Sequence, residues 1–183
     1  MAAPIAIARP LPDEFAAGSA GYIARAPLVS HAVRQLEVQR DALVAFLSPL
    51  SDAAAGYRYA PEKWSIRDLI AHMSDTERVL GYRLMRIGRG DDTPLPGFEE
   101  SDYARAAAAD RRPVADLLDE WVAVRNATQA LVRGMPVTAW AQRGVANGHP
   151  VTAGALLYII LGHVEHHRHI LEERYGVGAN GVR

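Results

Sequence analysis

The chain has no cysteine among its 183 residues. This absence excludes disulfides, zinc ribbons, iron–sulfur ligation and a cysteine nucleophile together. Lysine is almost missing as well, because Lys63 is the only one and every other strong base is an arginine. Any site chemistry must therefore be built from histidine, carboxylate, hydroxyl and arginine side chains.

An excess of charge of either sign is also lacking. The 20 Lys and Arg residues balance 21 Asp and Glu residues, so the formal net charge is −1. A chain with this balance has no field that would attract nucleic acid or an anionic lipid surface. We therefore expect neither nucleic acid nor membrane as a partner.

Long hydrophobic runs are missing too. The longest covers residues 153–162, whereas a membrane span needs roughly 20 residues. The N-terminus has no basic start followed by an apolar core, which is the pattern of a secretory signal. These features predict a cytoplasmic location.

Strand alternation is nearly absent, and helical periodicity dominates the chain. The expected helices cover residues 27–47, 65–88, 113–134 and 152–174. Ser65 and Thr152 are typical N-cap residues, and Pro113 suits the first turn of a helix. Four helices of about 20 residues with apolar stripes predict an all-α fold, a four-helix bundle.

The connection between the second and third helices, residues 90–112, is unusually long. A helix of 20 residues is about 30 Å long, so this crossover loop can run back along the bundle and make the second and third helices parallel. The prediction is up-down-down-up topology, with the second and fourth helices antiparallel. Phe98 and Tyr103 in the loop either cover a site or pack between protomers. We expect residues 1–183 to form one domain, with residues 1–26 as an N-terminal extension packed on the bundle.

What the chain has in quantity is histidine, with seven in all and four of them between positions 163 and 169. His163 and His167 are four residues apart, so they lie on one face of a helix about one turn from each other. This spacing allows two imidazoles to converge on one metal ion. It also fits a surface pair or a hydrogen-bonded pair, because the motif is short.

His72 lies on the second expected helix and, taken alone, is best interpreted as a core imidazole. Its depth favours another interpretation. His72 is seven residues from the start of its helix and His167 is seven from the end of its own. In an antiparallel pair both offsets are about 10 Å, so the three imidazoles can lie at one level. Three histidines with a vacant fourth position are typical of a catalytic metal site.

Three further residues near that level are weak catalytic candidates. Thr76 and Arg83 lie within about 40° of the stripe of His72 on a helical wheel, and Arg83 has a possible role in binding a substrate anion. His166 is a further ligand, a proton carrier or a solvated neighbour. Glu77 points away from His72 and is interpreted as an ion-pair residue. The arginines of the same helix are expected along a partly exposed face, paired with Asp75, Glu77 or acidic residues of the following loop; they are Arg83, Arg86 and Arg89.

The motifs taken together resemble those of the DinB-like superfamily, the YfiT-type metalloenzymes. The similarity runs from about residue 9 to residue 176. It is carried by Tyr59-Ala-Pro-Glu-Lys-Trp-Ser-Ile-Arg-Asp-Leu-Ile-Ala-His72, by residues 75–78, 82–83 and 89–98, and by Gly162-His-Val-Glu-His-His-Arg-His-Ile170.

This resemblance implies a four-helix bundle of up-down-down-up topology. It also implies a divalent metal held by a histidine of the second helix and by an H-x-x-x-H pair on the fourth. Matched residue by residue, the metal ligands are His72, His163 and His167. Related proteins are often dimers, so a homodimer is expected. Three imidazoles suit zinc, nickel, iron or copper alike, so the metal is not identified.

The function that follows is a divalent-metal-dependent transferase or hydrolase. Its nucleophile is a metal-activated water or the sulfur of an external low-molecular-weight thiol, because the chain has no thiolate of its own. The alternative is a non-catalytic bundle of a stress response, which binds metal or a protein partner. A third interpretation is a structural bundle whose histidines are core residues.

Overall fold

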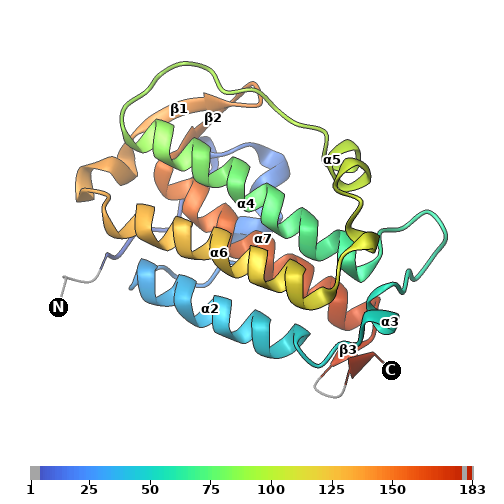
Figure 1. Ribbon diagram of the computed structural model, residues 1–183. Coiled ribbons are helices and arrows are strands. Elements are labelled where there is room, and N and C mark those ends of the chain that lie inside the picture. Colours follow the sequence, from blue (N-terminus) through green and yellow to red (C-terminus); the bar gives the residue numbers. More distant parts are fainter. Residues whose placement is uncertain (1–4, 179–180, 183) are drawn as a thin grey trace.

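The computed structural model describes residues 5–178 and 181–182. Four long helices dominate it and pack side by side, as Figure 1 shows. They are α2 (Ala32–Leu47), α4 (Ile66–Gly88), α6 (Val114–Arg133) and α7 (Ala153–Glu173). The protein is mostly helical, as the apolar periodicity predicts.

The ends of the long helices follow from local sequence. The Ser65 side chain accepts a hydrogen bond from the Asp68 backbone N–H, and the Asp68 carboxylate accepts one from the Ser65 backbone N–H, which is a complete capping box. Thr152 caps α7 in the same way by accepting from the Ala155 N–H. Both predicted N-caps are thus confirmed.

The remaining elements are short. The helices among them are α1 (Ala20–Arg25), α3 (Asp52–Ala55), α5 (Glu100–Ala107) and the 3-10 turns η1 (Pro12–Glu14), η2 (Ala17–Ser19), η3 (Ala109–Arg111) and η4 (Val137–Ala141). The strands are β1 (Arg143–Ala146), β2 (His149–Thr152), β3 (Val177–Gly178) and β4 (Gly181–Val182), which pair as two antiparallel hairpins.

One predicted helix start is wrong by five residues, and another differs by a single residue. The first long helix begins at Ala32 and not at residue 27, because the segment before it is extended and Val29 accepts a backbone hydrogen bond from Ile7. Pro113 has extended backbone and is the N-cap of α6, so the helix starts one residue later than expected.

The β1–β2 hairpin is an element that the periodicity missed. Its turn is Asn147-Gly148, with φ of 52° and 75°. This dipeptide is the typical sequence of a tight hairpin turn, because both positions need a positive φ. The strands have four residues each, too few for a clear alternation.

The segment between α4 and α6 passes over the β1–β2 hairpin and reaches α5 at the other end of the long helices (Figure 1). It is anchored to the hairpin, because the Leu95 N–H donates to the Val145 carbonyl and the Asn147 N–H donates to the Leu95 carbonyl. The segment also contains α5 and η3, which the loop length did not predict.

Residues 5–26 pack closely against α7. The hydroxyl of the buried Tyr158 donates to the Ile7 carbonyl and accepts from the Val29 N–H. At Gly162 a Cβ atom would overlap the backbone of Tyr22. The close approach of α1 to α7 therefore requires glycine at this position.

The interior of the bundle holds two apolar clusters. One contains Leu36, Leu84 and Leu157, and the other contains Leu43, Ile70, Trp121 and Leu171. Between them each long helix places buried polar side chains, namely Gln39, His72, Thr76, Glu77, Arg125, Thr128, Gln129, His163 and His167. We call these nine residues the polar layer.

No helix in the described part of the chain has the length and apolar character that crossing a membrane requires.

Candidate metal centre

Three imidazoles of the polar layer converge on one point. His72 comes from the first half of α4, whereas His163 and His167 come from the second half of α7. Their Nε2 atoms are separated by 3.1 Å (His72 to His163), 3.2 Å (His72 to His167) and 3.0 Å (His163 to His167). The side chains are 4%, 3% and 6% exposed. The structure thus brings together the three residues that the sequence singled out as ligands.

The arrangement suits a cation better than a set of hydrogen bonds. Each Nε2 atom is either one hydrogen-bond donor or one acceptor. Three converging Nε2 atoms therefore cannot all be paired in hydrogen bonds with one another. Three lone pairs can instead bind one ion. His72, His163 and His167 would hold such an ion, because their Nε2 separations of 3.0–3.2 Å suit ligands of one divalent metal.

The protonation of the three histidines fits the same interpretation. Burial, and secondarily the neighbouring His166, lowers the pKa of His72 to about 4. Burial and the facing imidazoles also hold the pKa values of His163 and His167 well below the usual value for histidine. The rings are therefore neutral near pH 7, which is the state that binds metal.

Thr76 supports His72 from one turn further along α4. Its Oγ1 lies 3.4 Å from the Nδ1 of His72, and the residue is 5% exposed. When Nε2 carries the lone pair, Nδ1 carries the proton and donates a hydrogen bond to the Thr76 hydroxyl. Thr76, a candidate from the sequence, thus lies behind His72 and contacts the nitrogen that faces away from the cluster. Among the described residues, the buried Nδ1 of His167 has no such partner.

Two aromatic rings that sequence reasoning did not assign flank the histidines. The Trp64 ring lies 4.7 Å from that of His72, and the Tyr22 ring lies 5.4 Å from that of His163. Trp64 belongs to the same motif as His72, residues 59–72, so the sequence motif could have indicated that the two residues act together. Tyr22 lies in a segment without periodicity, and its approach to α7 depends on the tertiary contact at Gly162.

His166 points to the edge of the cluster. It is half-buried, and its ring packs against those of Tyr22 and His167 at 5.3 and 5.1 Å. Only His72, His163 and His167 have ligand atoms close enough to share an ion within the described residues. His166 is a neighbour of the centre and not one of the three converging rings.

The ion pairs of α4 differ from the expected ones. Glu77 does not pair with an arginine of its own helix. Its carboxylate accepts from the Nε and Nη2 of Arg125 at 2.8 and 2.7 Å, and both side chains are almost fully buried. Arg125 in turn donates to Gln39 at 2.8 Å. The positive charge of Arg125 also contributes to the low pKa of His163.

The arginines that follow on α4 have different surroundings. Arg86 pairs with Asp91 of the following loop, as predicted, and Arg89 is exposed. Arg83 is only 8% exposed, which corrects the expectation of a partly exposed side chain. It donates to the Pro96 carbonyl at 2.6 Å and lies within reach of no carboxylate of the described residues.

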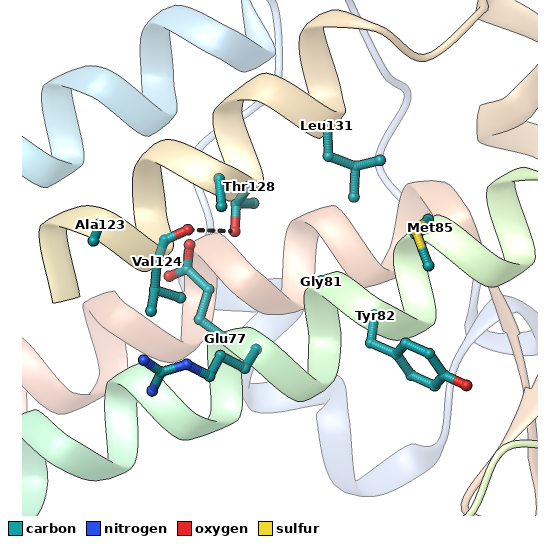
Figure 2. Close-up of a pocket in the computed structure, with 10 residues that line it drawn as sticks. Glu77, Gly81, Tyr82, Met85, Ala123, Val124, Thr128 and Leu131 are labelled. Carbon is teal, nitrogen blue, oxygen red and sulfur yellow. Dashed lines mark hydrogen bonds between the residues drawn. The ribbon is translucent and has the colours of Figure 1, made fainter. Parts of the chain in front are cut away.

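One apolar groove next to the polar layer is not lined by the three converging histidines. It lies between α4 and α6, has a volume of about 530 Å³, and is lined by Gly81, Tyr82, Met85, Thr128 and Leu131 among others (Figure 2). Glu77 lines it, but none of the three converging histidines does. Any chemistry at the histidine cluster is therefore separate from this groove.

The model of the DinB superfamily matches residues 35–171, which is more than half of the chain. The chain belongs to the DinB superfamily. The match includes all three converging histidines, as well as the Glu77–Arg125 ion pair. No curated protein matches the chain.

Two solved structures have a similar fold. YfiT from Bacillus subtilis, described as a probable metal-dependent hydrolase with an unusual four-helix bundle topology, aligns with a TM-score of 0.66 and 16% identity over 80% of this chain and 87% of its own. A mycothiol-dependent maleylpyruvate isomerase aligns with a TM-score of 0.62 and 18% identity over 74% of this chain. This chain spans 57% of the isomerase. At these identities the similarity shows the fold alone.

Proposed function

We propose that this protein is a divalent-metal-dependent enzyme that acts on a small molecule, as a hydrolase or a transferase. His72, His163 and His167 are its metal ligands in this proposal. The observation that carries it is the convergence of three buried, neutral imidazoles at Nε2 separations of 3.0–3.2 Å. Structural zinc sites are closed by four protein ligands, whereas three ligands are typical of catalytic sites.

A divalent ion at this position supplies a Lewis acid, which lowers the pKa of a water or of an external thiol. The protein's own residues contribute orientation and the exclusion of bulk water. Thr76 accepts a hydrogen bond from the Nδ1–H of His72 and so fixes the tautomer of that ring. Trp64 packs against the ring of His72, and Tyr22 packs against the ring of His163. The chain has no cysteine, so the nucleophile comes from water or from a low-molecular-weight thiol.

The comparisons support both branches of this proposal. YfiT is described as a probable metal-dependent hydrolase, and the isomerase as mycothiol-dependent. The experiment is to load the protein with zinc, nickel or iron(II) in turn. Ester and amide hydrolysis are then measured alongside thiol transfer from glutathione, bacillithiol and mycothiol. Turnover that is lost in His163→Ala supports the proposal, and turnover that is equal in this variant and the parent contradicts it.

The proposal includes the up-down-down-up order of the long helices. Glu77 and Arg125 each lie 11 residues after the first residue of their helices, α4 and α6, and they are paired. Equal offsets at one level are expected of parallel neighbours. Gln39 of α2 donates to the Leu161 carbonyl of α7, and the two residues lie seven and eight positions after the first residues of their helices. These two helices are therefore also parallel in the proposal. Residues 1–26 belong to the same single domain in this proposal.

We further propose a cytoplasmic homodimer. Exposed Tyr82, Met85 and Tyr103 offer apolar surface for self-association. Light scattering at micromolar concentration tests the oligomeric state. A mass near twice 19.9 kDa is expected, and a mass near 19.9 kDa contradicts the dimer.

A second candidate function is a non-catalytic metal-binding bundle. The near-complete burial of the three imidazoles favours it, because an ion held among buried side chains would have little access to solvent or substrate. Azide or cyanide binding to the cobalt(II)-substituted protein separates the two functions. A change in the visible spectrum indicates an exchangeable position and favours the enzyme, and an unchanged spectrum favours the binding bundle.

A further inference from the structure

A buried cation without a carboxylate partner lies further along α4 from the histidines. Arg83 is 8% exposed, and burial lowers the pKa of its guanidinium. A buried charge is costly unless it is paired or well hydrogen-bonded. The other buried arginine of the bundle, Arg125, has a bidentate carboxylate in Glu77. Among the described residues, Arg83 has the Pro96 carbonyl as its hydrogen-bond acceptor and the Phe98 ring, whose centroid lies 6.0 Å from the guanidinium carbon, but no carboxylate.

The unused donors of Arg83 border open space. Arg83 has no nitrogen among the fully buried polar atoms that lack a partner, although only its Nη2 donates to a described residue. Arg83 lines two cavities: one of about 120 Å³ between α4, α7 and the β1–β2 hairpin, which we call the Arg83 cavity, and one of about 280 Å³ beside Phe98. Since one water takes up about 30 Å³ in the liquid, a carboxylate or phosphate group fits in the Arg83 cavity.

The walls of this cavity suit an anion. Ser19, Asn147 and His149 add a hydroxyl, an amide and an imidazole, which can all donate hydrogen bonds. The described lining residues include no Asp or Glu. The remaining lining side chains are largely apolar, which strengthens the attraction between a guanidinium and an anion because the local dielectric is low.

The cavity adjoins the seam that carries the histidines. Leu80 lines it from α4 and Ile159 from α7, and these residues are four positions from Thr76 and His163 respectively. Four residues span about 6 Å along a helix. Arg83 and His72 are 11 residues apart on α4, so the cavity lies about 16 Å further along the helix than the level of the three imidazoles.

We propose that the Arg83 cavity is a binding site for the carboxylate or phosphate group of a small anionic molecule. Arg83 is its charge partner, and Ser19, Asn147 and His149 are its hydrogen-bond donors. That this molecule is the substrate or co-substrate of the metal centre rests on the proposed function. Anion binding itself does not, because Arg83 is separated from the ligands by at least two turns of α4.

The test uses chelator-treated protein, so that its outcome does not depend on the metal centre. Thermal unfolding and calorimetric titration are measured with sodium succinate and with inorganic phosphate at constant ionic strength, and uncharged succinamide serves as the blank. A ligand that binds only the folded protein raises the melting temperature. Both anions, or one of them, are expected to raise it, and succinamide is not. The more effective anion identifies carboxylate or phosphate as the class.

Two variants of Arg83 assign the binding. Arg83→Met removes the charge, and Arg83→Gln keeps a donor for the Pro96 carbonyl without the charge. Each is expected to weaken anion binding by about tenfold or more, the loss of one charged contact. Arg89→Met, at an exposed position of the same helix end, is expected to bind like the parent. Arg83→Met is also expected to melt no lower than the parent, because an unpaired buried charge is removed.

Two results overturn the proposal. The first is a parent protein that responds to neither anion; a lower melting temperature in Arg83→Met would then make Arg83 a structural tie to Pro96. The second is anion binding in Arg83→Gln that equals that of the parent. Failure of the metal proposal alone leaves the anion titrations unchanged, so the two are distinguishable.

Discussion

At the scale of single residues, the site depends on which groups stand behind the three imidazoles. A histidine ligand needs its second nitrogen satisfied to keep one tautomer and one ring orientation. Thr76 provides this for His72, at 3.4 Å and inside the bundle. The helical wheel placed Thr76 near the stripe of His72, and the structure shows its hydroxyl behind the His72 ring. In the proposed site it therefore positions a metal-binding histidine.

The first prediction concerns that hydroxyl. Thr76→Val keeps the shape and removes the acceptor, so metal affinity is expected to fall about 10- to 100-fold. Competition with a chromogenic chelator measures it. Thr128→Val is the matched control, because Thr128 is also buried and in the middle of a helix. Its hydroxyl donates to the Val124 carbonyl at a distance of 3.3 Å and makes no hydrogen bond to a histidine. Equal affinities in the two variants would refute the role of Thr76.

A second prediction concerns the ion pair next to the cluster. Arg125→Met leaves the Glu77 carboxylate buried without its cation, which costs about 3–5 kcal/mol of unfolding free energy. The double variant Glu77→Leu with Arg125→Met removes both charges and is expected to cost much less. Urea unfolding of the parent, the single variant and the double variant gives the three values. A double variant as unstable as the single one would show that the destabilisation does not come from the unpaired Glu77 carboxylate.

At the scale of elements, the polar layer explains how a bundle can hold ionisable groups. Each long helix is apolar near both ends and polar in one band, so the two apolar clusters close the layer above and below. Periodicity and caps were sufficient to predict α4 and α7, because Ser65 and Thr152 act within one turn of sequence. The depth argument for His72 and His167 worked because rise per residue is constant in a helix.

Other elements could not be predicted from the same signals. The pairing of Glu77 with Arg125 depends on which helices are neighbours, and the sequence offered closer arginines on α4. Tyr22 reaches His163 only because residues 5–26 fold back along α7. The β1–β2 hairpin is set by Asn147-Gly148, a two-residue signal outside any periodic stretch. In each case the deciding contact is between segments far apart in the chain.

The third prediction tests the contact between α1 and α7. Gly162→Ala would place a methyl group on the Tyr22 carbonyl, and such overpacking costs about 1–3 kcal/mol. The control is Gly81→Ala on α4, where the nearest atom is Thr128 Oγ1 at 3.8 Å. There alanine is expected to stabilise by up to about 1 kcal/mol, because glycine is unfavourable inside a helix. Opposite signs in thermal unfolding support the account, whereas a stabilised Gly162→Ala would contradict it.

At the scale of the whole molecule, the fold concentrates reactive groups in one interior place. Membership of the DinB superfamily and the similarity to YfiT explain the bundle, but they do not supply the reaction. This chain combines three neutral imidazoles, no cysteine and a buried Arg83 without a carboxylate partner among the described residues. Together these features support the proposal of a centre that activates water or an external thiol, and the proposal of an anion site near it.

The central claim is that the three histidines hold one divalent ion. The most direct test is the metal content of the purified protein by mass spectrometry of the elements, for the parent and for His72→Ala, His163→Ala and His167→Ala. His169→Ala is the control, because His169 is exposed and faces Glu173 on the same helix. About one ion per chain is expected in the parent and the control, and a small fraction of that in the three variants. Stoichiometric metal that survives both His72→Ala and His163→Ala would contradict the account.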